Sequence, residues 1–166
     1  MIKTLTALVV IASNIGPASG QTVQASYTEL VGTWRCTTSF DDESSVTRVL
    51  TETTFDADGA RTEAGHIQWF DANTTAIAEF TALSEVELKG AIFEMDLVSI
   101  NFEEPRITRR TQKAGVFNPR LEFENRVGIY KTYSSDAVFD VVELNGDRFA
   151  TSAPDTGTRS LCVRKG

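Results

Sequence analysis

Apolar and polar residues alternate along most of the chain, which is the pattern of β-strands that bury one face. The alternating stretches are rich in Thr, Val, Ile, Phe and Tyr, and turn-forming residues separate them about every ten residues. We therefore predict an all-β fold, an antiparallel barrel or sandwich of about eight strands. Because no repeat or linker divides the sequence, a single domain over residues 26–166 is expected.

Two hairpins are the clearest local predictions. Asp58-Gly59 suits a two-residue turn, because glycine readily adopts a positive φ, and it makes the numbers of facing residues add up to 117. Asn145-Gly146 suits a second turn of the same kind, with a sum of 291. The predicted facing pairs are Leu50 with Ile67, Arg48 with Trp69 and Thr51 with His66 in the first hairpin, and Val142 with Phe149 in the second.

Further strands are expected over residues 90–104, 107–117, 120–125 and 126–134. One segment is ambiguous. Residues 74–88 contain Ala, Glu and Leu in helix-like proportion, with Ile77, Phe80 and Leu83 or Ser84 near one face. A short helix is therefore the alternative to a strand in this segment.

Residues 1–25 have the features of an export signal. Lys3 precedes a short apolar stretch, Leu5–Ala12, and small residues follow, so that cleavage after Gly20 or after Ala25 is expected. The stretch is too short to span a membrane. We expect the mature protein in the periplasm or outside the cell.

Charge and composition exclude several classes of protein. The chain is 41% hydrophobic and 23% charged, which fits an ordinary globular domain. Its net charge is −7, and removal of Lys3 with the signal leaves 15 basic and 23 acidic residues, a net charge of −8. Such a chain repels nucleic acid, so we predict no nucleic-acid partner. No apolar run is long enough for a membrane span.

The two cysteines predict a disulfide. Cys36 and Cys162 are an isolated pair in a chain expected in an oxidising compartment, which favours a bond between them. A metal site would need more soft ligands, and a catalytic thiol would need a neighbouring base, whereas His66 is the only histidine. We predict no metal and no cofactor.

The disulfide also predicts a register. If the first and last strands are antiparallel neighbours, the bond sets the sum of facing residue numbers at 198, which places Trp34 opposite Arg164. A guanidinium stacked on an indole contributes about 0.5 to 2 kcal/mol. We therefore expect Trp34 and Arg164 to close the barrel as a pair.

A Gly-x-Trp sequence at Gly32 and Trp34, a late Arg164 packed on that Trp, and antiparallel hairpins between them resemble the lipocalins and the wider calycin barrels, including lipocalin-like domains of exported bacterial proteins. The resemblance implies an up-and-down barrel whose interior can hold one small, largely apolar ligand. Aromatic residues either fill that interior or line a ligand site, and both alternatives stay open. Candidates for the polar end of a pocket are His66, Trp69 and Tyr130.

The leading hypothesis is a non-catalytic binding protein, because the chain has one histidine and no Gly-x-Ser-x-Gly turn for a serine nucleophile. The alternative is a packed β-domain that acts through its surface as an envelope interaction or inhibitor module, with its protein partner unidentified. The volume of the interior distinguishes the two, since small-molecule sites usually enclose about 300 Å³ or more.

A basic cluster is the remaining feature. It could recognise an anion or an acidic partner, or be a solvated strand face that balances nearby acids. Its members are Arg106, Arg109, Arg110 and Lys113, with Arg120 close behind.

Overall fold

The computed structural model describes residues 25–41, 45–72, 74–109, 124, 137–154 and 158–166. Residues 1–24 of the predicted signal, including the expected cleavage site after Gly20, lie outside these ranges. So do Tyr130, Arg110, Lys113 and Arg120, and almost all of the strands expected over residues 107–117, 120–125 and 126–134.

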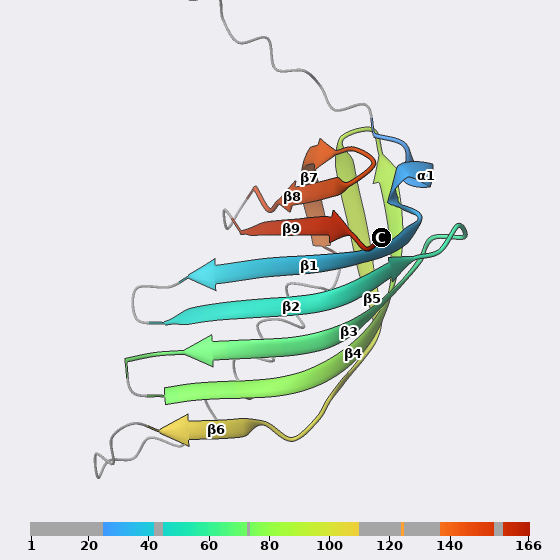
Figure 1. Ribbon diagram of the computed structural model, residues 1–166. Coiled ribbons are helices and arrows are strands. Elements are labelled where there is room, and N and C mark those ends of the chain that lie inside the picture. Colours follow the sequence, from blue (N-terminus) through green and yellow to red (C-terminus); the bar gives the residue numbers. More distant parts are fainter. Residues whose placement is uncertain (1–24, 42–44, 73, 110–123, 125–136, 155–157) are drawn as a thin grey trace, which may run out of the picture.

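The prediction of an all-β fold is confirmed, and the short helix α1 lies outside the segment where a helix is the alternative (Figure 1). Every strand pairing among the described residues is antiparallel. The elements are α1 (Tyr27–Leu30), β1 (Gly32–Asp41), β2 (Val46–Phe55), β3 (Ala60–Phe70), β4 (Thr74–Lys89), β5 (Ile92–Phe102), β6 (Arg106–Arg109), β7 (Ala137–Leu144), β8 (Arg148–Ser152) and β9 (Arg159–Arg164).

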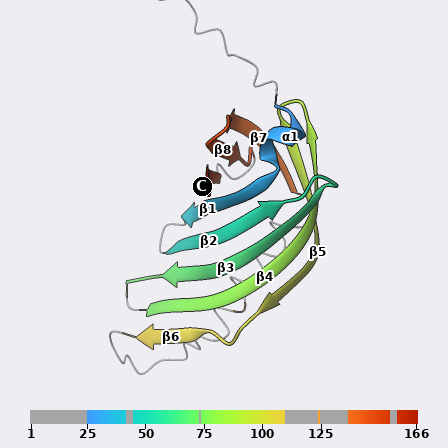
Figure 2. The ribbon, with the colours of Figure 1, turned by 45° about the vertical axis from the view of Figure 1, so that its right-hand side comes forward.

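Eight of the strands close into a barrel. The order β3-β2-β1-β9-β8-β7-β5-β4 ends where β4 pairs again with β3, so the sheet has no open seam in this ring. β6 pairs with the first residues of β4, beyond the part of β4 that pairs with β5. Figures 1 and 2 show that the long strands β1 to β4 curve strongly, as closure requires.

The two ends of the barrel differ. At one end, here called the α1 end, lie α1, the C-terminus and the turns β2–β3, β4–β5 and β7–β8 (Figure 1). The opposite end, here called the far end, contains the end of β1 and the start of β2 together with β6. Side chains alternate between the barrel interior, here called the lumen, and the outer surface.

The predicted register of the first hairpin is wrong by one residue. Facing residue numbers add up to 116, so that Leu50 faces His66, Arg48 faces Gln68 and Thr51 faces Gly65. The reason is a three-residue loop: the Asp56 N–H donates to the Ala60 carbonyl at 2.8 Å, and Gly59 has a φ of +96°. Glycine supplies this positive φ without strain in two-residue and three-residue loops alike.

The predicted register of the second hairpin is also wrong. Leu144 rather than Val142 faces Phe149, and the pairing shifts at a bulge between Val141 and Glu143. The turn is stabilised by the Asn145 side chain, whose Oδ1 accepts the N–H groups of Asp147 at 3.1 Å and Arg148 at 2.9 Å. The turn therefore lies one residue later than predicted.

The ambiguous segment is a strand, and the helical alternative for it is wrong. β4 runs for 16 residues, and from Thr74 to Val86 every second residue is buried. Ala and Glu are accommodated because the alanines lie on the inner face and the glutamates on the outer face. Pairing with β3, β5 and β6 satisfies the backbone, and this tertiary context overrides helix propensity.

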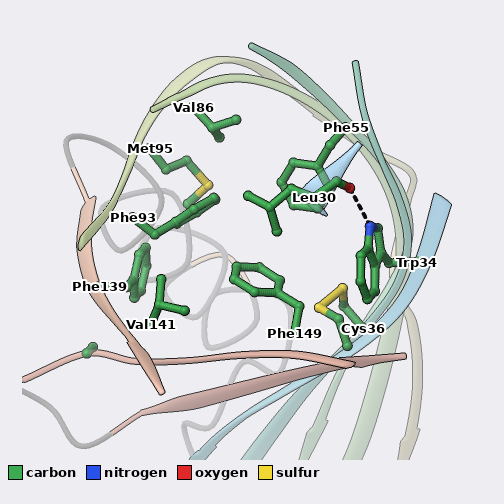
Figure 3. Close-up of a cluster of buried hydrophobic side chains, with 12 residues drawn as sticks. Leu30, Trp34, Cys36, Phe55, Val86, Phe93, Met95, Phe139, Val141 and Phe149 are labelled. Carbon is green, nitrogen blue, oxygen red and sulfur yellow. Dashed lines mark hydrogen bonds between the residues drawn. A yellow bond between two sulfur atoms is a disulfide. The ribbon is translucent and has the colours of Figure 1, made fainter. Parts of the chain in front are cut away.

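The interior contains two apolar clusters. The larger one fills the α1 end, where side chains from most of the strands point into the barrel (Figure 3). Its buried members are Leu30, Trp34, Cys36, Phe55, Val86, Phe93, Met95, Phe139, Val141, Phe149, Ala153 and Cys162. The second cluster extends toward the far end and comprises Val49, Ile67, Trp69, Ala76, Ala78, Phe80 and Ala82.

Candidate functional site

The seam between the first and last strands has the predicted register. β1 and β9 are antiparallel neighbours, Cys36 faces Cys162, and Trp34 faces Arg164. The two cysteines form a disulfide that spans 126 residues of sequence, and both are buried. A covalent bond therefore joins the strands that close the barrel.

The Arg164 side chain connects separate backbone segments at the α1 end. Its guanidinium lies 4.2 Å from the centre of the Trp34 ring, and its Nη1 donates to the Val31 carbonyl at 2.9 Å. Nη2 donates to the Glu29 carbonyl, and Nε donates to the Gly146 carbonyl, both at 2.5 Å. One side chain thus links α1, the start of β1 and the β7–β8 turn.

Trp34 completes this closure from inside. It is fully buried, and its indole N–H donates to the Leu30 carbonyl at 2.7 Å, which holds α1 across the barrel end (Figure 3). Gly32 has a φ of +123°, and a Cβ there would lie 2.8 Å from Nη1 of Arg164. Glycine is therefore required both by the backbone and by the guanidinium beside it.

The α1 helix is also attached to the first hairpin. The Tyr27 hydroxyl donates to the Asp56 carbonyl at 2.9 Å. Burial, and after it the charges of Asp58 and Asp56, raises the pKa of the Tyr27 hydroxyl above its usual value. The hydroxyl therefore keeps its proton, and this hydrogen bond, to higher pH than a free tyrosine would.

The geometry of Arg164 makes its replacement by lysine costly. We expect Arg164→Lys to lower the free energy of unfolding by about 2 kcal/mol, because an ammonium cannot reach three carbonyls in different directions while stacking on the indole. Urea unfolding followed by Trp fluorescence measures this change. Lys165→Arg at the neighbouring exposed position is the control, and an Arg164→Lys chain as stable as the wild type would contradict the structural role described for the guanidinium.

Aromatic rings fill the lumen at the α1 end. The Phe149 ring is central: its centre lies 5.5 Å from that of Phe93, 6.0 Å from Phe55 and 6.3 Å from Trp34. Phe139 packs on Phe93 at 6.2 Å. The rings meet at inclined angles, as is favourable for aromatic pairs, so this half of the lumen is a packed core.

Beyond these rings the lumen wall becomes polar. Inward positions on β1, β2, β3, β8 and β9 carry hydroxyl or charged side chains, which we call the polar belt. Two of its hydroxyls bond across the seam, with Thr38 Oγ1 donating to Ser160 Oγ at 2.9 Å. The members of the belt are Thr38, Thr51, Thr53, Arg61, Glu63, Thr151 and Ser160.

A buried ion pair forms the strongest part of the belt. Arg61 Nη2 lies 2.5 Å from Glu63 Oε1, and the two side chains are only 13% and 4% exposed. Thr53 donates to the same carboxylate oxygen at 3.2 Å. Thr51 lies 2.9 Å from Thr53 and must be the donor to it, because Thr53 gives its own proton to the carboxylate.

The Arg61 side chain also contacts apolar groups. Its guanidinium carbon lies 5.9 Å from the centre of the Phe55 ring, and Nη1 lies 2.7 Å from the sulfur of Met95. Its Nε is buried and has no hydrogen-bond partner among the described residues. Buried donors are normally satisfied, so this N–H lacks the partner that such groups usually have.

A cavity of about 40 Å³ lies between the rings and the polar belt. Its lining combines apolar core residues with members of the polar belt: Cys36, Thr38, Val49, Thr51, Phe55, Arg61, Glu63, Phe93, Met95, Phe139, Phe149, Thr151, Ser160 and Cys162. The volume is about that of one water molecule and far below the ~300 Å³ of usual small-molecule sites. The described lumen therefore has no room for a large apolar ligand as it stands.

The residues predicted for the polar end of a pocket do not lie together. Trp69 is inward and buried in the second cluster. His66 occupies an outward position of β3 and borders a surface groove of about 500 Å³ with Glu79, Asn101 and Glu103. Tyr130 lies outside the described residues, so its part of the prediction stays a prediction.

The predicted basic cluster is described only in part. Arg106 is exposed on β6, and its guanidinium lies 3.4 Å from Glu79. Arg109 ends β6, and only its backbone is described, whereas Arg110 and Lys113 are not described.

Sequence reasoning missed Arg61 and Glu63. Two charged residues separated by one position on a strand usually indicate a solvated face. The signal that could have found them is the alternation along the strand, because Arg61 and Glu63 share a face with the apolar Ile67 and Trp69.

In comparisons with known proteins, no family model and no curated protein matches this chain. Within the described residues, no group of three or more His, Cys, Asp or Glu side chains could hold a metal ion. The helical part of those residues contains no segment long and apolar enough to cross a membrane.

Proposed function

We propose that this chain is an exported, non-catalytic, lipocalin-like binding protein that holds a small molecule in the barrel lumen. The observation that carries the proposal is the Arg61–Glu63 pair with its hydroxyl partners at the cavity. Burying charged groups costs several kcal/mol, and a core of apolar residues would close the barrel at least as well. A polar belt at a cavity is instead suited to orienting a polar group of a ligand.

The ligand is expected to carry both a polar and an apolar part. Rings occupy the α1 end, so a long apolar molecule cannot extend there. Toward the far end the inner face of β4 carries Ala76, Ala78 and Ala82, whose side chains are shorter than the rings at the α1 end. We therefore place the polar group at the belt and the apolar part along β4, which differs from the largely apolar ligand predicted from sequence.

Binding requires side chains around the cavity to move. Met95 and Phe149 both line it, and methionine in particular adapts its shape at low cost. The Arg61 guanidinium contacts the Met95 sulfur, so movement of this methionine also frees a donor of the arginine. Export fits the same proposal, since the disulfide is compatible with an oxidising compartment.

Native mass spectrometry of the protein purified from its own compartment tests the proposal, with a retained molecule as the expected result. Displacement of a fluorescent fatty acid measures affinity for amphipathic molecules. Thr151→Val removes one hydroxyl from the cavity wall while keeping the shape, and it should weaken binding about tenfold. Thr62→Val, at an exposed outward position of β3, is the matched control and should leave binding unchanged.

An unchanged polypeptide mass together with no affinity for the fluorescent fatty acid would overturn the proposal. Equal losses in the Thr151 and Thr62 variants would show that binding occurs outside the lumen. Either result would favour a packed barrel that acts through its outer surface.

A further inference from the structure

Four arginines that are far apart in the sequence lie on one side of the outer surface of the barrel. They lie on β1, β2, β8 and β9, at positions that alternate with buried residues and are all exposed. Cross-strand pairing orders them: Glu52, Arg35, Val163 and Arg148 form one row, and Arg48, Ser39, Arg159 and Ser152 form another. We call this surface the arginine face.

An apolar row lies between the two rows of arginines. It contains the aliphatic Leu50, Leu161 and Ala150, with Thr37 as its one polar member, and these residues face one another across β2, β1, β9 and β8. Leu161 is 43% exposed and Val163, in the adjacent row, is 46% exposed. Arginine around exposed aliphatic side chains is a composition typical of protein interfaces.

The arginine face is positive although the chain as a whole is acidic. Two carboxylates beside it in the described part of the chain are paired: Glu52 binds Lys165 at 2.7 Å, and Glu143 lies 3.5 Å from Arg148, a member of the face. Asp140 borders the face beyond Ser152. A partner must therefore offer negative charge around an apolar centre.

The opposite side of the same barrel has the complementary properties. Around the ring, β2 and β3 lie between β1 and β4, and β8 and β7 lie between β9 and β5. The β4–β5 surface is therefore across the barrel from the arginine face. This surface contains a groove of about 750 Å³, here called the acidic groove. Its lining is Asp58, Gly59, Ala60, Glu85, Val86, Glu87, Glu94, Met95, Asp96, Ala137 and Val138.

Carboxylates in the acidic groove face one another directly. Glu85 is opposite Asp96, and Glu87 is opposite Glu94, an arrangement that is unfavourable between adjacent strands. Lys89 contacts Glu87 at 3.1 Å and Glu94 at 2.7 Å, whereas Glu85 and Asp96 lie further along the strands. Cations from outside would relieve the remaining repulsion, and Val138, 52% exposed, adds an apolar contact.

We propose that the arginine face of one copy binds the acidic groove of a second copy, so that the chain associates head to tail. The two surfaces are opposite in charge, and each carries exposed aliphatic side chains. The convex barrel wall at the arginine face also fits the hollow of the acidic groove. Because they lie on opposite sides of one barrel, each bound copy presents a free surface to the next. Association of this kind forms rings or short open chains rather than twofold dimers.

Sedimentation velocity of the protein purified after expression of the full chain tests this proposal. We expect the average mass to rise with concentration and to fall with added salt, because exposed charges at the contact are screened. Arg35→Glu with Arg159→Glu should weaken association at least tenfold, as should Glu85→Lys with Glu87→Lys. Mixing the two variants should restore association, since one keeps an intact groove and the other an intact arginine face.

Arg106→Glu is the matched control, because it reverses an exposed arginine on β6 outside both surfaces and should leave association unchanged. All substitutions are at exposed positions, and circular dichroism verifies that each variant is folded. A wild-type chain that stays monomeric up to about 1 mM would overturn the proposal, as would variants that associate normally or whose mixture stays dissociated. Binding of the arginine face to anionic phospholipid vesicles by a monomeric chain would overturn it in favour of a membrane surface.

Discussion

Replacing Cys36 and Cys162 together with alanine is expected to lower the free energy of unfolding by about 4 kcal/mol. The bond closes a segment of 126 residues, so the unfolded chain gains much conformational freedom when it is lost. Urea unfolding followed by circular dichroism measures the change. The slope of free energy against urea should also rise, because an uncrosslinked chain exposes more surface when it unfolds.

Reduction provides the matched comparison. A thiol reductant should destabilise the wild type about as much as the double substitution and should leave the alanine variant unchanged. The variant should keep its β spectrum, because β1 and β9 still pair over six residues on each strand and Arg164 still binds three carbonyls. A double variant as stable as the wild type would show that the unfolded chain is already compact without the bond.

The register of the barrel seam could be predicted from sequence because a small number of residues is enough to define it. Two isolated cysteines in a chain expected to be exported specify one bond, and a bond between neighbouring antiparallel strands specifies which residues face each other. The pairing of Trp34 with Arg164 follows from that register. Prediction succeeded here because the constraint is covalent and independent of turn geometry.

The hairpin registers could not be predicted with the same certainty. Asp58-Gly59 is compatible with loops of two or three residues, and the choice of three shifts every pair along β2 and β3 by one. A shift of one residue exchanges the inner and outer faces of a strand. The sequence alone does not say which face of β3 points inward, so Arg61 and Glu63 could not be assigned to the lumen.

The arginine face was missed for a different reason. Arg35, Arg48, Arg148 and Arg159 are separated by up to 124 positions, and only closure of the barrel places their strands side by side. A search for local clusters instead selects Arg106 and its neighbours. A surface whose residues are brought together by the strand order can thus be recognised only after the topology is known.

Loss of the Glu63 charge is expected to be the most destabilising change within the polar belt. Glu63→Gln leaves the Arg61 guanidinium buried without a counter-charge, which costs about 3 kcal/mol. Glutamine keeps the size of the side chain and can still accept from Thr53, so the effect reports the charge. Urea unfolding measures it, and Glu52→Gln, which breaks an exposed pair with Lys165, is the control with no expected change.

A double variant separates stability from function. Arg61→Met with Glu63→Leu removes both charges and fills the same space with apolar side chains, so its stability should return to within about 1 kcal/mol of the wild type. If the belt orients a ligand, this stable protein should still lose the retained molecule in native mass spectrometry. A double variant that retains the molecule would assign the pair a purely structural role, whereas one as unstable as Glu63→Gln would show that apolar groups cannot replace the ion pair inside this barrel.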